Sequence, residues 1–381
     1  MFCLTAFLVG LVDMASDLYV PMLPAIEHAF KVNDSLIGAT ISVNLVGLGI
    51  SGLYYGKLSD LIGRRPVIIF GLTIFCIASL ACGFSKNITQ LLLARLVQGI
   101  GGGVAFSVGR AIVLDMYSGP KAAEMFSRLQ SVIVVSPAFA PTIGGFIGYI
   151  YGWKSIFYIL FSISFALLVA IFLWGKETLP QEKRTTENVR SIRKEYLYFF
   201  SRPIFLKFAG VQIFTVGWFW SELGFLPQFF VDYYGVQASI VGLYLGALMI
   251  AYFLGTAINQ YLVHIFNLKT LINIGLGTFF FSVGLLCTAQ ILGFMSPWLF
   301  VLLRLPASIG LGLVFGNAGA LAIEHEKDRT GSASAFIGAA ELLAGATCIA
   351  IVGLFSATTV YPLAIMITVC SIFSGILIWK K

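Results

Sequence analysis

The stretch GKLSDLIGRRPV, residues Gly56 to Val67, lies between two apolar segments that are each long enough to cross a lipid bilayer. Glycine tolerates a positive φ and lets two helix ends approach closely. Gly56 and Gly63 therefore suit a tight turn between two helices. Arg64 and Arg65 make the turn basic, and basic loops of membrane proteins lie on the cytoplasmic side. The stretch predicts a cytoplasmic turn between two membrane spans.

The composition of the whole chain agrees with a membrane protein. Of its 381 residues, 59% are hydrophobic and only 11% are charged, and the mean hydropathy is +0.94. So few charges cannot cover a surface exposed to water, so we expect the lipid bilayer to surround the chain. The six cysteines are scattered and show no metal or disulfide spacing. We expect no metal, no cofactor and no enzymatic activity.

Apolar runs of about 20 residues predict an all-α integral membrane protein with twelve spans. The predicted spans are 3–25, 36–56, 66–84, 88–112, 124–150, 153–175, 204–231, 237–264, 268–293, 297–321, 331–356 and 358–379. Residues 176–203 are rich in Lys and Arg, unlike the rest of the chain. The sequence therefore predicts a six-helix bundle over 1–175, a basic cytoplasmic linker over 176–203 and a second bundle over 204–381.

The positive charges are distributed unevenly between the two sets of loops. The loops on one side and the adjoining helix ends hold 19 of the 24 Lys and Arg. The opposite loops hold only Lys31, Lys86 and Lys154, and Arg95 and Arg304 lie inside spans. This asymmetry predicts that both termini are cytoplasmic. The net charge of +7 therefore indicates membrane orientation, and we expect no nucleic-acid partner.

The two halves of the chain repeat. LLLARLVQGIGGGVAF (91–106) aligns with FVLLRLPASIGLGLVF (300–315) at an offset of 209 residues. The alignment matches Arg95 with Arg304 and brings two pairs of glycines into register. Repeats of this kind build transporters whose substrate binds near the middle of the membrane, between the two halves.

Three motifs carry a family resemblance. GKLSDLIGRR resembles the G-x-L-x-D-x-x-G-R-R/K signature of the major facilitator superfamily, in the loop between its second and third helices. DLYVPMLP (17–24) resembles the first helix of the bicyclomycin and chloramphenicol resistance type. SPAFAPTIGGFIG (136–148) resembles the fifth-helix signature of drug:proton antiporters. The resemblance implies the major facilitator fold, with two pseudo-symmetric bundles, in a multi-pass protein of the bacterial inner membrane, and export driven by protons. We expect a monomer.

Ionisable residues inside a span are costly and are candidates for function. Asp13 and Asp17 lie one turn apart in the first span, and Arg95 lies at a depth similar to that of Asp17. Glu341 lies near the middle of the eleventh span. The three histidines lie outside the predicted spans, so we assign proton coupling to Asp17, Asp13, Arg95 and Glu341. An ion pair between Asp17 and Arg95 is plausible, and the alternative is that Asp17 caps a backbone break before Pro21.

A second set of polar and aromatic residues is predicted to bind substrate. It comprises Tyr19, Asn44, Gln98, Trp218, Glu222, Phe225 and Glu341. Aromatic side chains offer flat apolar walls, and the polar groups offer orientation. Two alternatives remain for Glu222: it lies in water near the outer interface, or it pairs with Arg304 and stabilises the fold.

The third set is predicted to control the gates. It comprises Gly56, Asp60, Gly63, Arg64, Arg65, Arg110, Asp115, Pro137, Pro141, Gly144 and Gly145. The resemblance implies a cytoplasmic charge relay of Asp60, Arg64, Arg110 and Asp115 that touches the start of the eleventh helix near residues 330–334. This relay would latch the outward-open state. The prolines kink the fifth span, and its glycines allow close helix crossing.

The function predicted from the sequence is export of small organic molecules in exchange for protons, by alternating access. One alternative is a proton symporter that imports a metabolite or siderophore. Another is a membrane sensor that uses a transporter fold without turnover. The chain has no Walker A pattern, so ATP-driven pumping is not supported.

Overall fold

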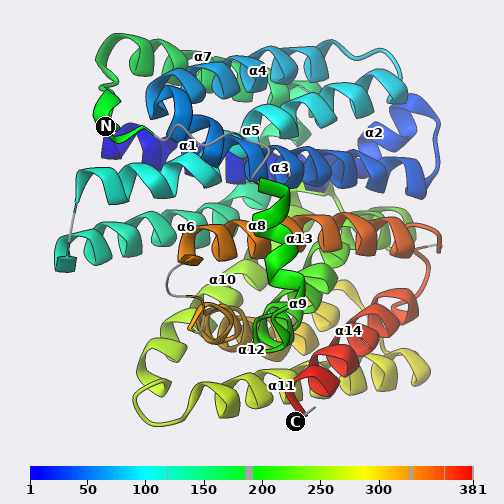
Figure 1. The fold of residues 1–381 in the computed structure, drawn as a ribbon. Helices are drawn as coiled ribbons and strands as arrows, with labels where there is room; N and C mark the ends of the chain where they lie inside the picture. Colours follow the sequence, from blue (N-terminus) through cyan, green and yellow to red (C-terminus); the bar gives the residue numbers. More distant parts are fainter. Residues whose placement is uncertain (118, 185–191, 325, 327–328, 356, 380–381) are drawn as a thin grey trace.

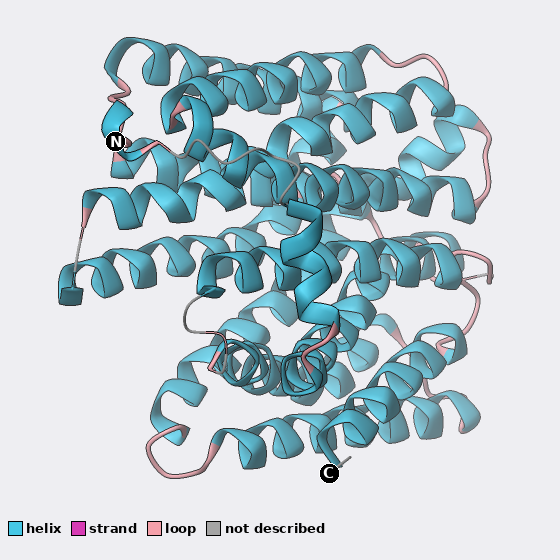
Figure 2. Ribbon diagram, viewed as in Figure 1, coloured by secondary structure: helices cyan, strands magenta, loops and turns pink. Residues whose placement is uncertain are grey.

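The computed structural model describes residues 1–117, 119–184, 192–324, 326, 329–355 and 357–379, and leaves some side chains within 119–138 and 192–195 undescribed. Figures 1 and 2 show a molecule built from long helices joined by short loops. In the described part, eleven segments are long and apolar enough to cross a membrane. With α6 (Gly119–Tyr151) as the twelfth, they match the twelve spans predicted from the sequence.

The first bundle contains the spans of the N-terminal half. Its first span, Phe2–Phe30, is divided into three pieces and the others are continuous. The elements are α1 (Phe2–Asp17), η1 (Val20–Met22), α2 (Leu23–Phe30), α3 (Asp34–Ile62), α4 (Arg64–Phe84), α5 (Ile88–Met116), α6 and α7 (Trp153–Trp174).

The second bundle contains the spans of the C-terminal half. They are α9 (Pro203–Gln228) with the π turn η4 (Phe229–Tyr233), α10 (Ala238–Leu262), α11 (Leu268–Ile291), α12 (Pro297–Ile323), α13 (Thr330–Val352) and α14 (Tyr361–Trp379). In Figure 1 the blue helices of the first bundle lie above the orange and red helices of the second.

The internal repeat is visible in the helix packing. In α5, a methyl group on Gly101 would collide with α4, and one on Gly103 would collide with α3. In α12, methyl groups on the matching Gly310 and Gly312 would collide with α11 and α10. Small residues let the backbones of membrane helices approach closely. Each half therefore packs its fourth helix against its second and third in the same way, which confirms the repeat.

The most extensive contacts between the bundles join α3 with α13 and α6 with α10; smaller contacts run from η1 to α9 and α10, and from α2 and α3 to α9. The Ser42 hydroxyl donates to the Ala346 carbonyl over 3.0 Å, and the Thr142 hydroxyl donates to the Gly242 carbonyl over 3.0 Å. Both contacts lie in the halves of the helices that are remote from the Gly56 to Val67 turn. We call this end, where α3 begins and α13 finishes, the sealed end.

The segment between the bundles contains η2 (Gln181–Lys183) and α8 (Ile192–Phe200). In Figure 1, α8 crosses the front of the molecule between the two bundles. Tyr196 donates its hydroxyl to the Leu53 carbonyl of α3 over 3.4 Å, and Phe199 packs on Phe336 of α13 with ring centroids 5.7 Å apart. The linker therefore contacts both bundles. The domain limits 1–175, 176–203 and 204–381 stay a prediction.

Candidate transport site

The first span breaks at Asp17. The helix α1 ends at this residue, and the chain continues through the 3₁₀ turn Val20–Met22, which contains Pro21, into α2. Proline removes a backbone donor and ends a helix. The Asp17 side chain is buried, and its Oδ1 atom has no hydrogen-bond partner among the described residues. The predicted backbone break is present, and it places a carboxyl group at the end of a helix inside the membrane.

Arg95 is fully buried and lies against the Tyr19 ring. Its guanidinium carbon is 4.3 Å from the ring centroid, and Nη1 donates to Gln98 Oε1 over 2.5 Å. Among the described residues it forms no ion pair with Asp17 within 4 Å, although the two groups interact electrostatically. The predicted direct ion pair is therefore wrong. The guanidinium is turned onto the aromatic ring because Tyr19 and Gln98 offer it a π face and an acceptor at close range.

Asn44 and Gln98 complete a polar network inside the first bundle. The Asn44 side-chain amide donates to the Arg95 carbonyl over 3.0 Å, and its carbonyl accepts from Ser16 over 3.3 Å. Gln98 donates to the Ser79 hydroxyl over 2.8 Å. These groups and the Tyr19 ring are buried between α1, α3, α4 and α5. In this structure Asn44 and Gln98 hydrogen-bond to Arg95 inside the bundle. Their assignment to substrate binding stays a prediction.

The second bundle neutralises its buried arginine locally. Arg304 Nη2 donates to Glu222 Oε2 over 2.6 Å, and both side chains are almost completely buried. The guanidinium also lies 4.7 Å from the Trp218 ring centroid. Glu222 therefore faces Arg304 inside the bundle and not water at the outer interface. Trp218 packs against this pair and Phe279, so it does not form an aromatic pocket with Tyr19.

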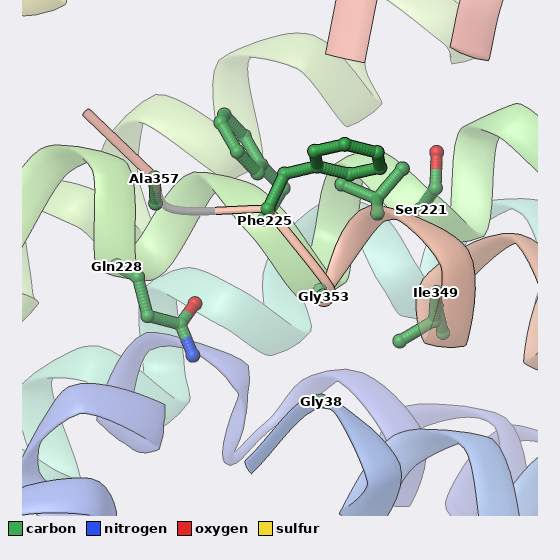
Figure 3. Close-up of a pocket in the computed structure, with 10 residues that line it drawn as sticks. Gly38, Ser221, Phe225, Gln228, Ile349, Gly353 and Ala357 are labelled. Atoms are coloured by element: carbon green, nitrogen blue, oxygen red, sulfur yellow. The ribbon is translucent and has the colours of Figure 1, made fainter. Parts of the chain in front are cut away.

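Phe225 lies near the sealed end. It lines a small space between α9, α13 and the start of α3, with Gly38, Ser221, Gln228 and Ile349 among the other lining residues. Figure 3 shows Gln228 and Ile349 on opposite sides of this space, with Phe225 above it and Gly38 below. Pockets for drug-sized ligands have volumes of about 300–1,000 Å³. The space beside Phe225 is far smaller, with room for about one water molecule, and neither Asp17 nor Glu341 lines it.

Asp13 of α1 and Glu341 of α13 are two further acids inside spans, one in each bundle. Both side chains are partly buried, and each has one oxygen without a hydrogen-bond partner among the described residues. Glu341 interacts electrostatically with Arg110 of α5 and lies beside the Gln212 amide. Tyr252 of α10 is within electrostatic range of both carboxyl groups. The proton-coupling role of the two acids stays a prediction.

The turn that opened the sequence holds a compact charge cluster. Arg64 donates to Asp60 over 2.5 Å and to Asp115 Oδ2 over 2.8 Å. Gly63 has φ = 104°, as its predicted role in the turn requires. Arg110 is not part of the cluster, because a residue five positions before Asp115 points about 140° away around a helix with 3.6 residues per turn. The contact expected with the start of α13 stays a prediction.

This cluster is formed at the end of α3 opposite the sealed end. The sequence predicted that these charges latch the outward-open state. The ion pairs are nevertheless complete while the remote end is closed. They lie within the first bundle, so they do not by themselves require the two bundles to be joined at this end.

Glu177 is a further residue of the turn that sequence reasoning missed. Its carboxylate accepts from the backbone N–H groups of Arg64 over 2.9 Å and Arg65 over 3.2 Å, so it caps α4. Burial alone would raise the pKa of Glu177, but four backbone N–H donors hold the pKa below its ordinary value. Arg65 donates to the Phe172 carbonyl over 2.7 Å. A cap supplied from 113 positions away leaves no local signal in the sequence.

The fifth span uses its small residues as predicted. A methyl group on Gly144 would collide with the Leu18 carbonyl at the break in the first span, and one on Gly145 would collide with the Ala238 carbonyl of α10. Pro141 is buried on the same helix. Its carbonyl lies so close to Gly242 of α10 that a methyl group on Gly242 would collide with it. The side chain of Pro137 lies outside the described residues. The helix α6 therefore touches both the Asp17 region and the second bundle.

Comparison with known proteins identifies the family. The sequence profile of the Major Facilitator Superfamily matches residues 5–346. The chain is a major facilitator superfamily transporter. It is 30% identical to the uncharacterized MFS-type transporter YdgK of Bacillus subtilis over 97% of this chain and 93% of that protein.

Named relatives confirm the resemblance to drug-resistance transporters. The chain is 26% identical to multidrug resistance protein MdtL of Vibrio parahaemolyticus over 99% of this chain and 94% of that protein. It is 23% identical to the bicyclomycin resistance protein homolog of Haemophilus influenzae over 94% and 90%. A crystal structure of a D-xylose-proton symporter superposes with a TM-score of 0.78 at 18% identity, covering 99% of this chain and 96% of that one. This last likeness shows the shared fold.

Proposed function

We propose that this transporter exports small organic molecules in exchange for protons, and that Asp17 is the main proton carrier. The observation that supports this role is the position of Asp17 at a helix break, enclosed, with one oxygen free of donors. A carboxylate that lacks water and donors readily takes up a proton, and a nearby guanidinium opposes that uptake. Because Arg95 is near but not in contact, small movements of α1 against α5 can shift the balance.

The proposed cycle uses the contacts between the bundles as its gate. In the present conformation α3 meets α13 and α6 meets α10 at the sealed end. Alternating access requires these contacts to open while the opposite end closes. The distribution of Lys and Arg supports an orientation with the sealed end outside and both termini in the cytoplasm of a bacterial inner membrane. We infer an inward-facing conformation and a single chain as the working unit.

Transport by purified protein in liposomes with an imposed pH gradient tests this function. Antiport predicts that protons moving one way drive the organic substrate the other way. Co-directional movement would support the proton symporter, and absence of flux under every gradient would support the sensor. The gradient supplies about 2.3 kcal/mol per charge for every 100 mV of its electrical part, which is ample for accumulation.

The variant Asp17→Asn tests the proton carrier. It should abolish uphill, proton-driven transport while leaving the protein folded, because the amide keeps the shape of the carboxyl group but binds no proton. Glu324→Gln is the matched control, since Glu324 is exposed at the end of α12. Uphill transport by Asp17→Asn at the rate of the control would show that another group carries the proton.

A further inference from the structure

An ion pair crosses from the first bundle to the second at the sealed end. The imidazole Nε2 atom of His28, on α2, lies 3.4 Å from the carboxylate Oδ1 atom of Asp232, on η4. The helix α2 leads into the start of α3, and η4 continues α9, whose Gln228 lines the small space together with Gly38. The pair therefore bridges the two bundles at the end that the contact between α3 and α13 closes.

The pair is open to the solution at this end of the molecule. The His28 side chain is 74% exposed, and the Asp232 side chain is 35% exposed. The attraction between them depends on one proton, because a neutral imidazole offers the carboxylate no opposite charge. Histidine is the side-chain type that changes charge between pH 5 and 8. The attraction across the sealed end is therefore present when the solution at that end is acidic, and it fades as the pH rises.

The charged neighbours of His28 belong to other residue types. The helix α2 packs against η1, α3 and α9, and its Phe30 contacts Trp153 of α7. The other charged or titratable residues of α2, of these elements at the sealed end and of the chain beside Asp232 are Glu27, Lys31, Asp34, Lys154, Tyr233 and Tyr234. The side chain of Asp34 lies outside the described residues, and Glu222 of α9 faces Arg304. Carboxylic acids, amines and phenols ordinarily titrate outside pH 5 to 8, so the imidazole is the group that responds in this range.

We propose that His28 and Asp232 form a latch that holds the sealed end closed when the solution at that end is acidic. Protonated His28 attracts Asp232 only while the bundles meet, so protons favour the closed state over the open one. The inference goes beyond the proposed exchange of substrate for protons, because it needs only that the bundles part at the sealed end. Exposed ion pairs are weak, so loss of the latch should raise the population of the open state about two- to fivefold.

Thiol labelling of the purified full-length protein in detergent tests the latch. The reporter is Ser42→Cys, in a background whose six native cysteines are replaced by alanine, because Ser42 is buried where α3 meets α13. A charged maleimide reaches this thiol only when the sealed end opens, so at low reagent concentration the labelling rate follows the open population. Thiol reactivity and other ionisable groups also respond to pH. Each rate is therefore divided by the rate of the same reporter in His28→Gln at the same pH.

The rate ratio should be close to one at pH 8 and should fall to between about one half and one fifth at pH 5.5. Asp232→Asn should abolish this fall. His28→Arg carries a permanent charge and should keep the ratio low at both pH values. The matched control is His264→Gln, because His264 is exposed beyond the far end of α10, and this variant should leave the fall intact.

The outcomes separate the latch from the transport function. A ratio that stays near one from pH 5.5 to pH 8, or a fall that survives Asp232→Asn, would overturn the inference. If the Ser42→Cys reporter fails to fold, Thr142→Cys at the contact between α6 and α10 gives the same measurement. Proton-driven transport with a flat ratio would refute the latch alone, whereas a pH-dependent ratio without any flux would support the latch and refute the transport function. Absence of labelling in every variant would overturn both, because the sealed end would never open.

Discussion

Replacing Glu222 by Gln should destabilise the second bundle strongly. The substitution keeps the size of the side chain but removes the negative charge that faces Arg304 at 2.6 Å. Arg304 is fully buried, and its Nε and Nη1 atoms have no other hydrogen-bond partner among the described residues. Breaking a buried ion pair from one side costs about 3–5 kcal/mol because a charge remains unpaired. An amide acceptor retains part of the hydrogen bond, so we expect about 3 kcal/mol.

The arginine side of the pair should behave differently. Arg304→Met leaves a buried carboxylic acid, which a proton can neutralise, whereas a guanidinium cannot lose its charge. Arg304→Met should therefore cost less than Glu222→Gln. The double variant removes both charges and should recover to within about 1 kcal/mol of the unaltered protein.

Unfolding by sodium dodecyl sulfate in mixed micelles measures these free energies. A loss of about 3 kcal/mol lowers the folding equilibrium constant by roughly two powers of ten. The reasoning would be refuted if Glu222→Gln differed from the unaltered protein by less than about 0.5 kcal/mol. It would also be refuted if the double variant were as unstable as the sum of the single variants, because then the two residues would act independently.

Three further outcomes follow from the turn and from the fifth span. Gly63→Ala should lower the same unfolding free energy by about 1–2 kcal/mol, because Gly63 has a φ of +104°. The control Gly56→Ala should be nearly neutral, because a methyl group at Gly56 would have room. Glu177 has a lowered pKa, so the stability that its carboxylate contributes is complete above the ordinary glutamate pKa and is lost as the pH falls through the lowered pKa. The difference in unfolding free energy between the unaltered protein and Glu177→Gln should therefore disappear in acid. Gly144→Ala should reduce both stability and transport by forcing two backbones apart, and Gly277→Ala, which meets nothing within 4 Å, should do neither.

The sequence was sufficient for features that depend on depth and spacing. Hydropathy located the spans, and the repeat matched Arg95 with Arg304. The family resemblance grouped Asp60 with Arg64, and the two form an ion pair. The break after Asp17 followed from the nearby prolines. These are properties of a single helix or of two aligned segments, so they can be read along the chain.

Features that depend on the direction of a side chain around its helix were harder to predict. Tyr19 and Trp218 have the depth expected for a substrate pocket, but their rings face buried arginines within the bundles. Arg110 was grouped with Asp115 although five positions place the two on different faces of α5. Helical geometry could have separated that pair. The direction of the aromatic rings depends on which helix faces which, and this is a property of the folded bundle.

The two repeat-related arginines differ in how the structure balances their charge. Both are fully buried against an aromatic ring, so the repeat duplicated an expensive charge. In the second half, Glu222 forms a direct ion pair of 2.6 Å with Arg304. This pair balances the charge without a proton or a substrate. The first half gives Arg95 two neutral acceptors, Gln98 Oε1 and the Thr40 carbonyl, and leaves the nearest carboxyl group on Asp17, at the end of an interrupted helix. A charge that is already paired is fixed, whereas one whose partner lies beyond contact responds to a proton. If Asp17 carries the proton, as we propose, the variable electrostatics belong to the first bundle.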